Sequence, residues 1–147
     1  MINEHIRCWN KQWLYVEHLY SKYASEYHLT MAAMNALDRI YHDQVCSQKY
    51  LCLVLSMPKQ TVSSFMRNLE NQELVVKDMC KADRRLCEYR LTETGTKLCE
   101  KIFSRLDKIE YNAFRSLSKE DREAFTRINA QLTQLIKAGM EEEHHGS

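Results

Sequence analysis

A short amphipathic helix with small polar side chains on one side is the feature that most constrains this sequence. The helix is expected to begin at Pro58, because the N–H that proline lacks would have no partner in a first helical turn. Its apolar residues follow the helical spacing i, i+3, i+4 and i+7 and must pack on neighbouring helices. These residues are Val62, Phe65, Met66 and Leu69.

The polar side of this helix has donors and acceptors that match the edges of DNA bases. Gln can bind adenine through two hydrogen bonds, Arg can bind guanine, and Thr can contact the thymine methyl group. A plain polar surface is the alternative, but surface helices usually favour Glu and Lys over Ser, Thr and Gln. The residues predicted to contact DNA from this region are Ser47, Lys59, Gln60, Thr61, Ser63, Ser64 and Arg67.

Two strands are expected after this helix, over residues 74–79 and 86–91. In the second strand, Cys87, Tyr89 and Leu91 alternate with polar residues at the period of two that a half-buried strand needs. The turn between the strands is basic and suits the phosphates or the minor groove, although a solvated charged turn is the alternative. Its candidate DNA contacts are Lys81, Asp83, Arg84 and Arg85.

The spacing Asp83-x-Arg85, followed by Leu91-Thr92-x-x-Gly95, resembles the wing motif of the MarR family of bacterial winged helix-turn-helix regulators. The resemblance extends from about residue 10 to about residue 138. It implies a mainly α fold with a small β-hairpin wing (α+β), in which Asp83 orients Arg85 towards the minor groove. It also implies a homodimer that reads palindromic double-stranded DNA, most often as a repressor that a small ligand releases.

One segment departs from the family pattern. Members usually have glycine between the recognition helix and the next strand, where this chain has Asn71-Gln72-Glu73-Leu74. Glycine adopts the left-handed, helix-ending conformation without strain, whereas a side chain there costs about 1–2 kcal/mol. Either Glu73 takes this conformation or the helix ends another way, with Asn71 as the candidate.

Five further helices are expected around this module. The first spans residues 4–27 and carries a broad aromatic stripe. The second begins after Thr30 and the third after Ser47, because both residues are good helix caps. After the wing, one helix runs from Glu93 to about Ser116, and the last begins after Ser118 with a capping-box-like sequence.

Residues 1–147 are predicted to form one domain, with the winged helix-turn-helix lobe at about 31–92. The helices at about 4–27 and 95–138 carry more apolar surface than such a lobe needs, so we expect them to form a dimer interface. A monomeric helical bundle is the alternative. In a dimer, two recognition helices one turn of DNA apart would read a palindrome. Residues 141–147 are expected to be frayed.

Aromatic side chains and two thiols are candidates for sensing. Through the family resemblance, a small aromatic ligand is expected in the cleft between the dimer helices and the winged lobe, with plain core packing as the alternative. Cys8 and Cys80 are candidate redox sensors, Cys80 because it lies beside basic residues near the wing tip; a spectator thiol is the alternative. The aromatic residues that could line the cleft are Trp9, Trp13, Tyr20, Tyr41 and Tyr50.

Other functional classes find little support in the sequence. No glycine-rich phosphate loop, HExxH or Gly-x-Ser-x-Gly motif occurs, so we predict no enzyme, no cofactor and no metal site. The longest apolar run, Leu51–Leu55, cannot span a membrane, and without a recognisable secretion leader the cytoplasm is expected. Two rival functions remain: a thiol-based redox-sensing regulator of the same fold, and a winged-helix protein-interaction module without DNA binding.

Overall fold

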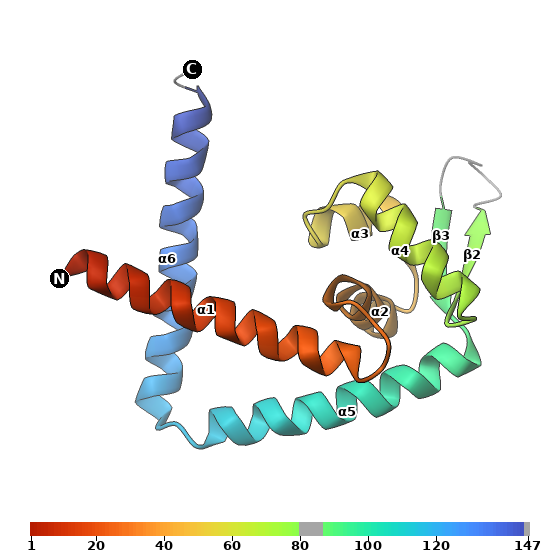
Figure 1. Ribbon diagram of the computed structural model, residues 1–147, viewed down its shortest axis with the longest axis horizontal. Coiled ribbons are helices and arrows are strands. Elements are labelled where there is room, and N and C mark those ends of the chain that lie inside the picture. The colour runs from red at the N-terminus through yellow and green to blue at the C-terminus, as the bar shows by residue number, and fades with distance from the viewer. Residues whose placement is uncertain (80–86, 146–147) are drawn as a thin grey trace. The chain divides into compact units, whose positions relative to one another are not determined.

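Helix α4 (Lys59–Asn71) packs against three neighbouring elements (Figure 1). These elements are α2 (Met31–Asp43), α3 (Gln48–Val54) and strand β2 (Val75–Met79). The computed structural model describes residues 1–79 and 87–145, and their side chains except those of residues 79 and 143–145. The helix predicted to contact DNA is therefore held in place by contacts with two other helices and a strand.

Two units divide the chain within helix α5 (Glu93–Arg115). The first unit, Met1–Phe103, contains α1 (Ile2–Ser25), the elements around α4 and the start of α5. The second unit begins at Ser104 and contains the rest of α5 and α6 (Lys119–His145). The elements predicted for the winged lobe lie in the first unit, whereas the assignment of the whole chain to one domain stays a prediction.

The core of the first unit is built from the apolar faces that the helical and strand periods predict. On α4, Val62, Met66 and Leu69 are buried and Phe65 is half-buried. Burying a side chain of this size stabilises the fold by about 1.5–3 kcal/mol. Other fully buried side chains of this unit are Met34, Leu37, Ile40, Leu51, Tyr89 and Ile102.

The sheet has three antiparallel strands in the described part of the chain, one more than the sequence predicted. The wing strands β2 and β3 (Cys87–Leu91) match the prediction to within one residue. The additional strand, β1 (Cys46–Ser47), pairs with the other side of β3 and places Cys46 opposite Tyr89. A strand of two residues is too short to show a period of two, so the sequence pattern could not reveal it.

The predicted helix caps are confirmed. The Ala33 N–H donates to Thr30 Oγ1 at 3.1 Å. Before α6, the Asp121 N–H donates to Ser118 Oγ, and the Ser118 hydroxyl donates to the Asp121 carboxylate. These bonds satisfy N–H groups that have no partner inside their helix, which explains where α2 and α6 begin.

The expected fraying of the last residues is wrong for most of that segment. Helix α6 continues to His145, although it was expected to end near residue 138. Lys137 Nζ lies 3.8 Å from Glu141 Oε1, the i, i+4 pair that supports an exposed helix. The helix therefore continues through most of the acidic tail; residues 146–147 lie outside the described residues.

Helix α4 ends in a Schellman motif, and Glu73 occupies its left-handed position with a φ of 57°. The Glu73 N–H donates to the Glu70 carbonyl at 2.9 Å, and the Leu74 N–H donates to the Leu69 carbonyl at 3.0 Å. Both bonds are those of the motif, and Leu69 and Leu74 are buried beside it. The alternative ending at Asn71 is therefore wrong, and the turn keeps its geometry without glycine.

Replacing Glu73 with glycine is expected to stabilise the protein by about 1 kcal/mol, because glycine removes the left-handed strain while leaving both backbone hydrogen bonds in place. Urea denaturation measures the change. Asn71→Gly is the matched control within α4, where glycine should destabilise by about 0.5–1 kcal/mol. A loss of stability in Glu73→Gly would contradict the strained turn.

Thr92 and Gly95 join the end of α4 to the start of α5. The Thr92 hydroxyl donates to the Glu73 carbonyl at 2.6 Å and accepts the Gly95 N–H at 2.9 Å. A β-carbon on Gly95 would lie 1.9 Å from the Leu74 carbonyl oxygen. The Leu-Thr-x-x-Gly part of the motif therefore has a packing role: a cap at threonine and a close backbone approach that only glycine permits.

Candidate nucleic-acid interface

Helices α3 and α4 form a helix-turn-helix. The Ser47 hydroxyl caps α3 by accepting the Tyr50 N–H at 3.1 Å. Between the helices, Ser56 has a φ of 51°, and the Met57 N–H donates to the Cys52 carbonyl. Pro58 then precedes the first residue of α4 with an extended backbone. The tight turn places α4 beside α3 with its apolar face inward.

The face of α4 opposite the core is polar and exposed. The buried positions lie on one side of the helix, and the predicted DNA-contacting side chains lie on the other. Of that set, Ser63 is half-buried at the boundary of the face, and Ser47, which precedes α3, is half-buried as well. The exposed members are Lys59, Gln60, Thr61, Ser64 and Arg67.

Gln48 is a polar residue of this region that the sequence did not single out. Its side chain is buried, with 8% of its surface exposed. Its amide nitrogen donates to the Lys59 carbonyl at 3.4 Å and to Ser63 Oγ. A single glutamine has no pattern that distinguishes it from a surface residue, so its location could be found only from the fold.

The base of the wing is described, and its tip is not. Arg90 Nε lies 3.4 Å from Asp78 Oδ2 across the β2–β3 pair, and both side chains are more than half exposed. Such an exposed pair contributes about 0–1 kcal/mol. The predicted DNA contacts Lys81, Asp83, Arg84 and Arg85 and the thiol of Cys80 lie outside the described residues.

Solved structures share this arrangement over nearly the whole chain. A MarR family regulator from Neisseria meningitidis, NMB1585, superposes with a TM-score of 0.77 at 21% identity, covering 97% of this chain and 99% of that one. Staphylococcus aureus MepR in a DNA complex gives 0.71 at 23% identity, with 94% and 97% covered. A C80S mutant of MarR from E. coli gives 0.68 at 17% identity, with 90% and 96% covered.

The fold is that of the MarR-family regulators. The predicted mainly α winged helix-turn-helix architecture is confirmed. No protein-family model and no curated protein matches the sequence. The likeness thus rests on structure, at identities of 17–23%.

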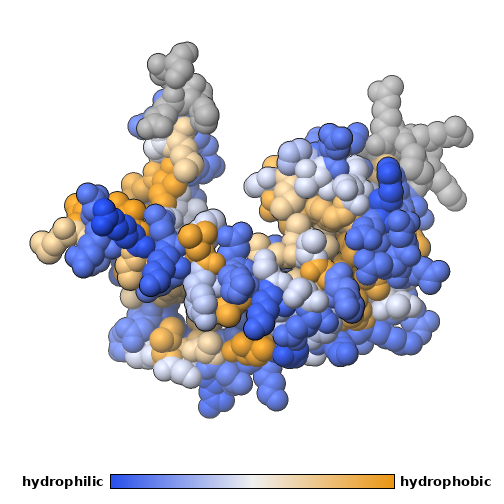
Figure 2. All heavy atoms as spheres, in the orientation of Figure 1, coloured by the Kyte–Doolittle hydropathy of each residue, from blue (hydrophilic) through white to orange (hydrophobic). Residues whose placement is uncertain are grey.

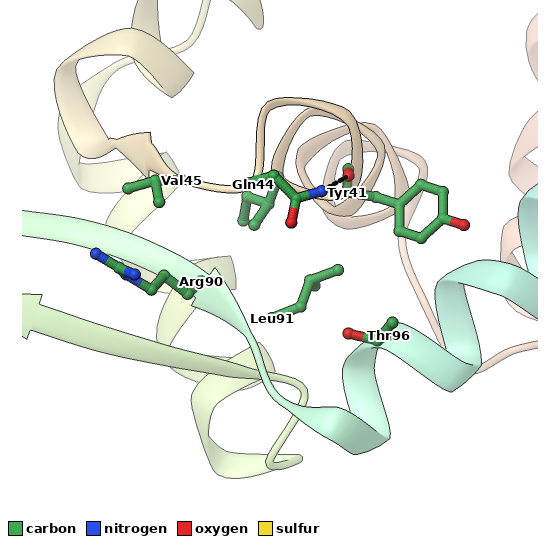
Figure 3. Close-up of a pocket in the computed structure, with 7 residues that line it drawn as sticks. Tyr41, Gln44, Val45, Arg90, Leu91 and Thr96 are labelled. Carbon is green, nitrogen blue, oxygen red and sulfur yellow. Dashed lines mark hydrogen bonds between the residues drawn. The ribbon is translucent and has the colours of Figure 1, made fainter.

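One of the aromatic residues predicted to line a ligand cleft of this MarR-type fold borders a cavity in the described part of the first unit. Tyr41, at the end of α2, lines a cavity of about 230 Å³ together with residues of β3 and α5 (Figure 3). Trp9, Trp13 and Tyr50 are exposed, and Tyr20 is half-buried. The other lining residues of this cavity are Ile40, Gln44, Val45, Arg90, Leu91 and Thr96.

The cavity is lined by both apolar and polar side chains, the apolar ones being Ile40, Val45 and Leu91. Figure 3 shows Leu91 and Thr96 next to Tyr41, whereas the guanidinium group of Arg90 extends away from it. The Gln44 amide donates to the Tyr41 carbonyl at 3.0 Å, and Gln44 has a φ of 67°. A small amphipathic molecule would meet the side chains of Tyr41 and Thr96 here, with Arg90 at the cavity's edge.

The buried thiols of the MarR-type core are poor redox sensors. Burial raises the pKa of Cys46 to about 11 and that of Cys99 to about 12, so both stay protonated at neutral pH. Cys8 is exposed on α1, where the Gln12 amide lies 3.6 Å from its sulfur. The redox predictions for Cys8 and Cys80 stay predictions.

Neither a metal site nor a membrane span is found among the described residues. Within residues 1–79 and 87–145, no group of three or more His, Cys, Asp or Glu side chains could hold a metal ion. No helix in the same residues is long and apolar enough to cross a membrane.

Proposed function

We propose that this protein is a DNA-binding transcription regulator that reads the major groove with α4. The observation that carries the proposal is the division of α4 into a buried apolar face and an exposed polar face. A helix of 13 residues is about 20 Å long and fits a groove about 12 Å wide. The side chains that would meet base edges are the set predicted from the sequence, of which Gln60, Thr61, Ser64 and Arg67 are exposed on α4.

The wing would add contacts beside the major groove. Strands β2 and β3 project as a hairpin whose base is paired from Val75–Leu91 to Met79–Cys87. Arg85, with Asp83 two residues before it, would place a guanidinium group in the minor groove or on the phosphates. This part of the proposal rests on the sequence motif and on the hairpin that carries it.

A homodimer is part of the proposal because α1 and the second unit each expose apolar side chains. On α1, Ile6, Trp9, Trp13 and Val16 lie at spacings of three and four, and each is more than a third exposed. Figure 2 shows hydrophobic side chains at the surface along α1 and along α6. Monomeric proteins seldom leave such contiguous apolar surface in water, so a second copy is the proposed occupant. In the second unit the exposed apolar residues are Ile109, Tyr111, Phe114, Leu117, Phe125, Ile128, Leu135 and Met140.

Release by a small aromatic ligand would act through the cavity that Tyr41 borders. The Tyr41 cavity lies between α2, β3 and the start of α5, so an occupant would touch the wing and the helix that follows it. A ligand that binds better to the spacing unable to bind DNA would release DNA through that difference in affinity alone.

The test uses a duplex that the purified protein selects from a random-sequence pool. Fluorescence anisotropy measures its affinity across a salt series, alongside Arg85→Ala. The proposal predicts a steep loss of affinity with salt, with the slope shallower by about one in the variant. Weak binding at every salt concentration, with the dimer intact, would contradict it and favour the protein-interaction module.

A further inference from the structure

The amide of Gln48 joins α3 to the recognition helix through two acceptors on α4. Its Nε2 donates to the Lys59 carbonyl at 3.4 Å and to Ser63 Oγ. Gln48 is buried, so these bonds replace the water that its amide would otherwise bind. The connection spans the helix-turn-helix from the first residue of α3 to the first turns of α4.

The chemistry of the two acceptors settles the orientation of this amide. A backbone carbonyl can only accept, so the NH2 group of Gln48, and not its oxygen, must face Lys59. The same NH2 group faces Ser63 Oγ, and the serine oxygen must therefore accept. A hydroxyl group has one hydrogen to donate. The hydrogen of Ser63 is thus directed away from Gln48.

The half-buried location of Ser63 leaves that hydrogen an outward path. Ser63 lies at the boundary between the core and the polar face of α4, one residue before the exposed Ser64 and four before the exposed Arg67. In the described part of the chain, no protein acceptor takes its hydrogen. In the free protein, water can accept this hydrogen, and an acceptor on a bound duplex could take the place of that water.

We propose that Gln48 is a positioning residue that makes Ser63 a hydrogen-bond donor to DNA. The partner is an acceptor atom of the duplex, either on a base edge, where purine N7 and the carbonyl oxygens accept, or on a phosphate. The inference rests on the proposed function. With Gln48 beside it, Ser63 would only donate to DNA, whereas a serine without such a neighbour could either donate or accept.

A double-mutant cycle tests the coupling between the two side chains. Ser63→Ala and Gln48→Met are each expected to weaken binding to the selected duplex about 3- to 10-fold, the size of one hydrogen bond. In the Ser63→Ala background, Gln48→Met is expected to cause almost no further loss, because its effect passes through the serine. Anisotropy at one fixed salt concentration gives all four affinities.

Gln48→Glu is the second variant, and it inverts the polarity at nearly constant shape. A carboxylate would take the Ser63 hydrogen and face the Lys59 carbonyl, so binding should be at least as weak as in Gln48→Met. A scrambled duplex separates the two sources of the acceptor. If the acceptor is on a base edge, the variants should bind the selected duplex more weakly and the scrambled duplex as before. If the acceptor is a phosphate, the variants should lose the same factor in affinity for both duplexes.

Thermal melting of each variant separates positioning from folding. If Gln48→Met lowers affinity by the same factor in the wild-type and in the Ser63→Ala background, the amide acts only as a structural support and the inference is overturned. Full affinity in Gln48→Met or in Ser63→Ala overturns it as well. Failure of the wild-type protein to show salt-dependent binding would instead overturn the proposed function.

Discussion

Replacing Gly95 with alanine is expected to destabilise the protein by about 3 kcal/mol or more. The added β-carbon would lie 1.9 Å from the Leu74 carbonyl oxygen and 2.9 Å from its carbon, so backbone must move. Overpacking against movable side chains typically costs about 1–3 kcal/mol, and here the obstacle is backbone. Urea denaturation followed by circular dichroism measures the loss.

The expected effect extends to the wing, because the same corner holds β2 and β3 together. The Thr92 N–H donates to the Leu74 carbonyl, the group that the new methyl would displace. Gly139→Ala is the matched control: that position lies within α6, has nothing within 4 Å of an added β-carbon, and should gain about 0.5–1 kcal/mol. Equal stabilities of the two variants would contradict the close approach at Gly95.

Replacing Trp13 with glutamate is expected to convert the dimer into a monomer. Trp13 lies in the apolar stripe of α1 and is 58% exposed in the single chain. Losing a tryptophan anchor and burying a charge should weaken association about 100-fold or more. Sedimentation velocity should then show a species of 17.5 kDa, whereas the wild-type protein is expected to sediment at twice that mass.

The control for this prediction is His18→Glu. His18 is also exposed on α1, on the side of the helix away from the apolar stripe, and the substitution introduces the same carboxylate. It should leave the dimer intact. A monomeric wild-type protein, or equal association of the two variants, would show that the exposed stripe of α1 is not the dimer interface.

Periodic patterns predicted the large elements of the fold well. The spacing of Val62, Met66 and Leu69 identified the buried face of α4, and cap residues such as Thr30 and Ser118 located helix starts. These features succeed because each is encoded within a few neighbouring residues. The C-terminal extension of α6 was missed because a run of glutamates was interpreted as fraying, although it continues a helix that has good formers before it.

Features that depend on distant residues could not be predicted. Strand β1 exists because β3 offers Cys46 and Ser47 a partner about forty residues further on. The left-handed Glu73 is stabilised by a turn that Thr92 also bonds. Nothing local to Cys46 and Ser47 encodes their pairing, whereas for Glu73 the local sequence left two helix endings open.

In the candidate site too, features encoded by neighbouring residues were predicted, and those that depend on distant residues were not. The exposed polar face of α4 follows from the helical period alone, so its residues were identified from the sequence. Gln48 was not, because its role depends on the crossing of α3 over α4. The predicted aromatic cleft was only partly found: Tyr41 borders a cavity of the first unit, while Trp9 and Trp13 are exposed on α1.

The central claim is that the exposed face of α4 reads base sequence, and one measurement tests it most directly. Anisotropy would compare the affinities of the selected and the scrambled duplex for the wild-type protein, Arg67→Ala and Arg127→Ala. Arg127, exposed on α6, controls for the loss of one positive charge. We expect Arg67→Ala to lower affinity for the selected duplex about 10-fold and to reduce the preference, while Arg127→Ala keeps it. An unchanged preference in Arg67→Ala, or no preference in the wild-type protein, would contradict the claim.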